Sequence, residues 1–150
     1  MAEKQVPVGN HLNEIARIPA GVEVKDAIFI SSTDVRIDGS FHGKILAKGK
    51  IIFGEQSTFT GDIVCMDADI SGHFEGNIVV GNVLSLLATC AYKGVIKVCK
   101  LSVETGAKFD GTCKMITSEE YAKALKDFEA SIAGNKNPEL PLEKEKKQSN

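Results

Sequence analysis

Cysteine, histidine and aspartate side chains are the groups of this 150-residue chain that could bind a metal ion or act on a substrate. No CxxC pair occurs, and no cysteine and histidine have the spacing of a zinc finger, so free thiols are predicted. Asp67 and Asp69 are predicted to share an outward strand face, but no second acidic cluster supplies the further oxygen ligands of a hard cation. His42 and His73 each flank an aromatic residue, so alternation places both outward, as solvated side chains.

Sequence motifs that mark enzyme active sites are absent as well. The chain contains no Gly-x-Ser-x-Gly, no P-loop and no His-x-x-x-His motif. We therefore predict no catalytic residue, no cofactor and no metal site, and we expect that the protein is not an enzyme.

Composition and charge exclude two further classes of function. With 18 basic and 20 acidic residues the net charge is -2, which lacks the basic excess of a nucleic-acid-binding protein. No apolar run approaches the roughly 20 residues that span a bilayer. The first twenty residues also lack the apolar stretch of a secretory signal, so we expect a cytoplasmic protein in which disulfides do not form.

An internal repeat indicates what positions these side chains. An aromatic-x-Gly triplet recurs at positions 41, 59, 74, 92 and 109, with steps of 18, 15, 18 and 17 residues. Small residues precede each aromatic by two positions, and aliphatic residues, or a cysteine in the last repeat, follow it by four. Apolar residues alternate within each repeat, and a local period of two is the pattern of a β-strand. The triplets begin at Phe41, Phe59, Phe74, Tyr92 and Phe109.

A period of two inside a period near 17 predicts an all-β fold, a parallel β-helix (β-solenoid) of about six three-faced coils over residues 18–116. At about 4.8 Å between strands the solenoid is a rod roughly 30 Å long. A further step of 17 residues upstream predicts an earlier, degenerate coil, with Ile28 and Ile30 on inward positions and Asp26 where the repeat has glycine. A helical solenoid would need a period of 3.6, which this region lacks.

The same register places the four cysteines. Cys65, Cys90 and Cys113 fall on inward positions and are predicted to behave as small apolar residues. Cys99 falls on an outward position and is predicted to be the accessible thiol.

The two ends of the chain differ from the repeats. Residues 1–17 are predicted to form a flexible tail, in which Leu12 and Ile15 either anchor a membrane or lead into the first coil. Thr117 and Glu120 form a capping box that begins an amphipathic helix over 117–134, and the polar residues 135–150 are expected to be disordered. The apolar stripe of this helix either covers the last coil or contacts a partner or a membrane. The stripe consists of Tyr121, Leu125, Phe128 and Ile132.

A solenoid without caps ends in unpaired backbone groups and exposed apolar columns, which can pair with another copy. A non-closing contact between ends makes a filament. Contacts between like ends and contacts between unlike ends both remain open. So does the alternative that these residues are ordinary core covered by the tails. The candidate contacts are Val22, Val24, Ile28 and Ile30 on the first coil and Leu101, Val103, Phe109 and Met115 on the last.

The repeats resemble those of bactofilins, bacterial cytoskeletal proteins. The resemblance covers residues 18–116 and is clearest in VRIDGSFHG at 35–43, GEQSTFTGDI at 54–63 and ISGHFEGNI at 70–78. It implies a right-handed β-helix that polymerises end to end, without nucleotide, into filaments, bundles or sheets. Family members act as scaffolds that localise cell-envelope enzymes, help to set cell shape and in some cases bind the inner membrane face. The helical C-terminal segment and the short coil that begins at Phe59 depart from the family pattern.

We therefore predict a self-assembling scaffold that organises cell-envelope or cell-shape machinery, with itself as the main partner and no nucleic acid. The first alternative is a capped β-helical adaptor that stays small and binds an envelope protein through its outer faces. The second is an acyltransferase on a left-handed β-helix, but its hexapeptide rule does not fit steps of 15 and 17 residues.

Overall fold

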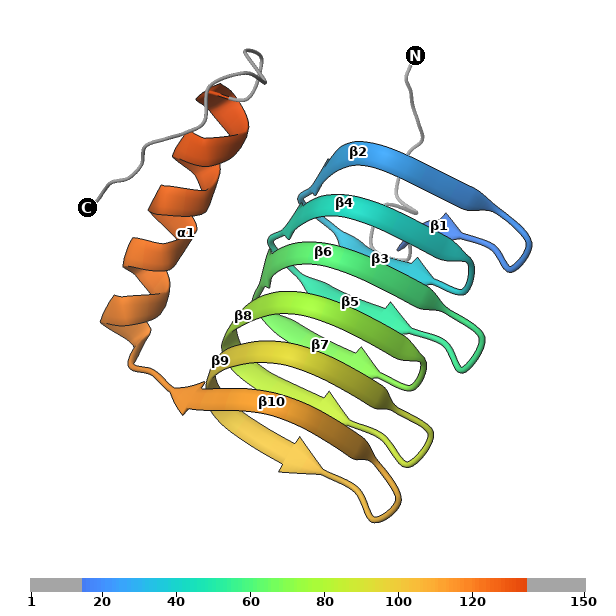
Figure 1. The fold of residues 1–150 in the computed structure, drawn as a ribbon. Coiled ribbons are helices and arrows are strands. Elements are labelled where there is room, and N and C mark those ends of the chain that lie inside the picture. Colours follow the sequence, from blue (N-terminus) through green and yellow to red (C-terminus); the bar gives the residue numbers. More distant parts are fainter. Residues whose placement is uncertain (1–14, 135–150) are drawn as a thin grey trace.

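The computed structural model describes residues 15–134, which form a β-solenoid of about six turns with one helix beside it (Figure 1). Coils alternate a short strand and a long, bent strand, and in the later coils the two merge into one continuous strand. The strands are β1 (Ile15–Ile18), β2 (Glu23–Ser31), β3 (Asp34–Ile37), β4 (Ser40–Ala47), β5 (Lys50–Phe53), β6 (Thr58–Cys65), β7 (Asp67–Ile70), β8 (His73–Leu86), β9 (Ala91–Val103) and β10 (Lys108–Met115).

All strand pairs in the described residues are parallel, and they stack the repeats in the predicted register. The short strands pair in the order β1-β3-β5-β7-β8, and the long strands pair in the order β2-β4-β6-β8-β9-β10. Phe41 pairs with Phe59, Phe59 with Phe74, and Phe74 with Tyr92, so each aromatic lies on the same residue of the next coil. The predicted β-solenoid is confirmed.

The core is a set of inward columns that run along the solenoid. The rings of Phe59, Phe74 and Tyr92 are stacked with centroids 4.8 and 4.7 Å apart, within the range of favourable aromatic pairs. Ile45, Ile63, Ile78 and Ile96 form a second column and are at most 1% exposed. Each coil therefore buries its apolar residues against the coils before and after it.

The first coil departs from the predicted register. The pairing of β2 with β4 shifts between Val24 and Ala27, and Asp26 in this bulge has φ +52°, where the later coils have glycine. The extra residue places Phe29, not Ile28, opposite the inward Ile45. The 17-residue step that put Ile28 and Ile30 on inward positions was therefore wrong, because a bulge adds one residue to the strand.

Helix α1 (Ser118–Gly134) begins with the predicted capping box. The Glu120 backbone N–H donates to Thr117 Oγ1 at 3.1 Å, and the Thr117 N–H donates to Glu120 Oε1 at 2.9 Å. This backbone hydrogen bond lowers the pKa of the Glu120 carboxyl. Two backbone N–H groups at the start of the helix are thereby satisfied, which explains why the helix starts here.

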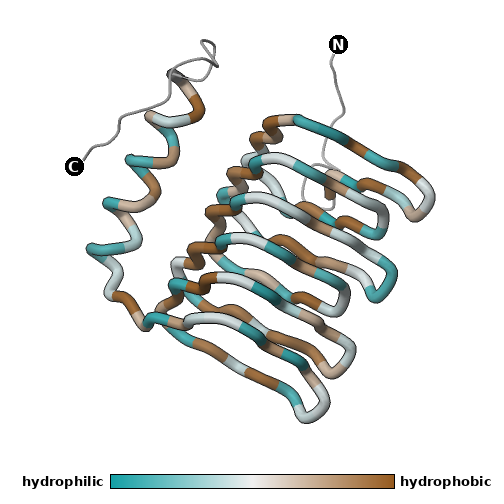
Figure 2. The backbone as a smooth tube through the Cα atoms, viewed as in Figure 1, coloured by the Kyte–Doolittle hydropathy of each residue, from teal (hydrophilic) through white to brown (hydrophobic). Residues whose placement is uncertain are grey.

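The helix lies along the side of the solenoid and runs back toward the first coil (Figure 1). Its stripe packs on a column of corner residues, which Figure 2 shows as an apolar edge repeated from coil to coil. Near its end, Lys48 pairs with Glu129 at 3.5 Å and Lys44 donates to Ser131 at 3.2 Å. The alternative in which the helix covers the last coil is therefore wrong. The column contains Leu46, Val64 and Val79.

Gly81 provides the space in which Tyr121 packs. A Cβ at position 81 would lie 2.7–2.8 Å from ring atoms of Tyr121, so we expect Gly81→Ala to displace the helix. Overpacking of this kind costs about 1–3 kcal/mol. Hydrogen exchange of the α1 amides should become faster while that of the solenoid core is unchanged. Adding Tyr121→Leu, which removes the clashing ring atoms, should restore part of the protection, and failure to do so would contradict this packing.

Candidate assembly interface at the solenoid ends

Each end of the solenoid has a strand edge without a partner in the described part of the chain. At the first coil β2 pairs only with β4, and at the last coil β10 pairs only with β9. Such edges present a row of N–H and C=O groups that can pair with another chain. The side chains on these edges decide what the ends can contact.

At the last coil, the predicted contacts are apolar and exposed. Val103 is 54% exposed, Phe109 37% and Met115 55%, and Leu101 is half-buried. Their partners one coil earlier are fully buried or nearly so, since Leu86 and Val98 are 0% and Tyr92 2% exposed. These side chains are exposed because no further coil follows the last one within residues 15–134. A second copy stacked there would give these residues the environment that their partners have.

At the first coil, the predicted contacts have different positions. Val24 is half-buried on the inward aromatic column, opposite Phe41, and Val22 is 42% exposed in the turn before β2. Ile28 and Ile30 are 40% and 59% exposed and point outward because of the bulge. Sequence analysis missed Phe29, which packs edge-to-face on Phe41 with centroids 6.4 Å apart. The repeat period gave no signal for it, because the inserted residue is seen only in the pairing of β2 with β4.

Both ends carry charges of both signs. Glu23 and Lys25 lie on β2, 3.8 Å apart, and Lys108 and Asp110 lie on β10. Neither end therefore presents the large single-sign field that repels another copy.

The groups that could have carried chemistry are in structural contacts or in solvent. Asp67 accepts hydrogen bonds from Asn82 and from the backbone N–H of Val83, and Asp69 pairs with Lys50 at 2.9 Å. Lys50 has a raised pKa, first because of its hydrogen bond to Asp69. His42 and His73 are exposed, as predicted. Among residues 15–134 no three His, Cys, Asp or Glu side chains are grouped as for a metal ion.

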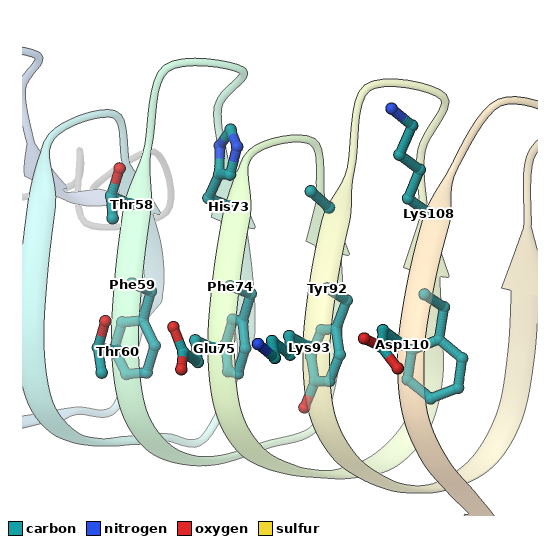
Figure 3. A pocket seen from close by; sticks show the side chains of 12 residues that line it. Thr58, Phe59, Thr60, His73, Phe74, Glu75, Tyr92, Lys93, Lys108 and Asp110 are labelled. Atoms are coloured by element: carbon teal, nitrogen blue, oxygen red, sulfur yellow. The ribbon is translucent and has the colours of Figure 1, made fainter.

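A surface hollow beside the repeat aromatics has a volume of about 570 Å³ and crosses several coils (Figure 3). Its rim consists of outward side chains in two rows, and the aromatic column lies behind them. Charges of both signs alternate without a cluster, and these side chains make no nucleophile–base pair. One row contains Thr58, His73 and Lys108, and the other contains Thr60, Glu75, Lys93 and Asp110.

The possible membrane or partner contacts are in two places. Leu12 lies outside the described residues, and Ile15 is 43% exposed in β1. Tyr121 is 8% exposed, and the rest of the helix stripe packs beside it on the solenoid. No helix within residues 15–134 is long and apolar enough to cross a bilayer.

The cysteines test the register experimentally. Cys65 and Cys90 are buried, and Cys113, predicted inward, is half-buried because it belongs to the last coil. Burial raises the pKa of Cys90 to about 11 and also raises that of Cys113. Because the thiolate is the reactive form, we expect a mild thiol reagent at pH 7–8 to label Cys99 first and Cys113 second.

Mass spectrometry of a labelling time course measures this order. Cys65 and Cys90 should react only after unfolding in denaturant, which serves as the positive control. Equal labelling of all four thiols in the native protein would contradict the register.

Comparisons with known proteins agree with this architecture. The bactofilin family, described as polymer-forming cytoskeletal, matches residues 16–114. Bactofilin BacO of Myxococcus xanthus (strain DK1622) is 29% identical over 96 residues, which cover 64% of this chain and 76% of that protein. No solved structure matches the chain. Because the family match covers nearly the whole solenoid and the repeats stack as one β-helix, this chain belongs to the bactofilin family of polymer-forming cytoskeletal proteins.

Proposed function

We propose that the protein polymerises end to end, without nucleotide, into filaments or sheets. The observation that best supports this is the exposure of Val103, Phe109 and Met115, whose partners in the preceding coil are fully buried or nearly so. Burying such a side chain completely is worth about 1.5–3 kcal/mol. Several together can offset the cost of bringing two copies into one rigid assembly, about 4–15 kcal/mol.

The edge of β10, which has no partner among the described residues, would orient a second copy on this apolar contact. Backbone N–H and C=O groups along Lys108–Met115 repeat at the strand period, so an added strand satisfies them as β9 does within the chain. Nucleotide has no part in the proposed mechanism, in keeping with a sequence that has no P-loop.

The polymer would serve as a scaffold in the cytoplasm, at the inner face of the cell membrane, that holds cell-envelope or cell-shape proteins in place. Membership of a polymer-forming cytoskeletal family supports the scaffold role. The outward side chains of the coils, which polymerisation leaves free, would provide the surface for those partners.

Negative-stain electron microscopy of the purified full-length chain tests the proposal. At micromolar concentration, without nucleotide or metal, we expect filaments or sheets, and adding ATP or GTP should change neither their number nor their length. Discrete particles of single-chain size across this concentration range would contradict the proposed function.

A further inference from the structure

The path of α1 brings the C-terminal end of the described chain to the first coil. The solenoid ends at Met115 on the last coil, but the helix runs back along its side (Figure 1). Ser131 contacts Lys44 and Glu129 contacts Lys48, and both lysines belong to the second coil. The described chain therefore ends near the first coil, not near the last.

The apolar column under α1 continues one coil beyond the helix contacts. Ile30 pairs with Leu46, and Leu46 pairs with Val64. The helix covers Leu46 and Val64, and Ile30 continues their column one coil further, where the helix does not cover it. Leu46 and Val64 are 3% and 2% exposed, but Ile30 is 59% exposed. Ile28, two residues away on the same strand face, is 40% exposed. The two isoleucines form an uncovered apolar pair at the point where the chain leaves the helix.

We propose that residues 139–142 of the same chain pack on Ile28 and Ile30. Leu140 and Leu142 are the aliphatic side chains of residues 135–150, apart from the prolines. Leu140 is six residues beyond Gly134, a distance of up to roughly 20 Å in an extended chain, which is enough to reach the first coil. A short tether of this kind gives a local concentration in the millimolar range.

The composition of this segment fits the surface that it would cover. Pro138 and Pro141 favour an extended chain, in which Leu140 and Leu142 point to the same side. Ile28 and Ile30 have the same spacing and also share one side. Because proline has no N–H, the covering segment would not offer a complete new strand edge, and natural proteins protect sheet edges in this way.

The packing itself does not depend on polymerisation, but its consequence rests on the proposed function. A segment beside β2 would compete with a copy that approaches the first coil, while the edge of β10 stays open. Assembly would then begin at the last coil, and the critical concentration of the full chain would be raised.

Hydrogen exchange of β2 in the full-length chain tests the packing, measured below the critical concentration or in a Phe109→Arg background. We expect L140S/L142S to speed exchange of the Glu23–Ser31 amides about tenfold, from partial burial of two leucines. N135S/N137S, in the same segment, is the matched control and should leave the rates unchanged. In an I28S/I30S chain the leucine substitutions should have no further effect.

The outcomes separate the packing from its consequence. Unchanged exchange in L140S/L142S would overturn the proposal, as would faster exchange caused only by deletion of residues 1–13, which would assign the surface to the N-terminal segment. A lower critical concentration in L140S/L142S would support the regulatory consequence. If the wild-type chain forms no polymer at any concentration, the proposed function fails while the exchange result for β2 still decides the packing.

Discussion

Replacement of Phe109 by arginine should abolish assembly while leaving the solenoid folded. Phe109 lies at the end of the aromatic column, where its ring is tilted against that of Tyr92 with centroids 5.6 Å apart and the side chain is 37% exposed. In the isolated chain a guanidinium at this position reaches water. In the assembled state it would be buried without a partner charge, which costs about 3–5 kcal/mol.

An energy of that size corresponds to an increase in critical concentration of at least about 100-fold, since each 1.4 kcal/mol is a factor of ten. Sedimentation across a concentration series measures this increase, and circular dichroism shows whether the β-solenoid is retained. Met66→Arg is the matched control, because Met66 is 39% exposed, close to the 37% of Phe109, but lies between β6 and β7 away from both ends. Equal effects of the two substitutions would contradict an interface at the last coil.

The solenoid and its last coil could be predicted from sequence because the repeat is regular there. Every inward position from Phe41 onward has an equivalent one coil away, so one correct alignment of the triplets places all of them. The exposed residues of the last coil follow from the same alignment, since Phe109 and Met115 are the final members of their columns. No tertiary information is needed for that step.

The first coil and the position of the helix could not be predicted in the same way. The bulge at Asp26 adds a residue within a strand, and a repeat period does not reveal where an extra residue is accommodated. The helix stripe shows that α1 needs an apolar surface, but two such surfaces existed, the last coil and the side column at Leu46 and Val64. Gly81, which leaves room for Tyr121, favours the side column through a contact between residues 40 positions apart.

Gly76→Ala should destabilise the solenoid more than any single surface substitution. Gly76 has φ +141°, and a Cβ there would overlap the carbonyl oxygen of Gly61 and lie 2.9 Å from its carbonyl carbon. The backbone conformation alone costs an L-residue about 1–3 kcal/mol. Overpacking against rigid backbone adds about 1–3 kcal/mol. Because Gly76 lies between two paired strands, neither neighbouring coil can move away without breaking its own ladder.

Two other glycines separate the conformational cost from the overpacking cost. Gly21 has φ +89° with open space around its missing Cβ, so Gly21→Ala should show the conformational cost alone. Gly111 has φ +154° and the same overlap, with the carbonyl oxygen of Gly94, but no coil follows it, so the last strand can shift and the loss should be smaller. Thermal unfolding in a Phe109→Arg background, where assembly does not stabilise the fold, should rank the losses Gly76→Ala, Gly111→Ala, Gly21→Ala.

The ranking of the three stability losses distinguishes two explanations of the glycine column. If the glycine column serves only a backbone angle, Gly21→Ala and Gly76→Ala should lower the midpoint temperature equally. If the column is needed because successive coils meet backbone to backbone, Gly76→Ala should lower it by at least about 5 °C more, the amount expected for 1–2 kcal/mol in a domain of this size. Failure of Gly76→Ala to fold at all, while Gly111→Ala and Gly21→Ala fold, would give the same answer, because Gly76 is the one of these three glycines whose strand is paired on both sides.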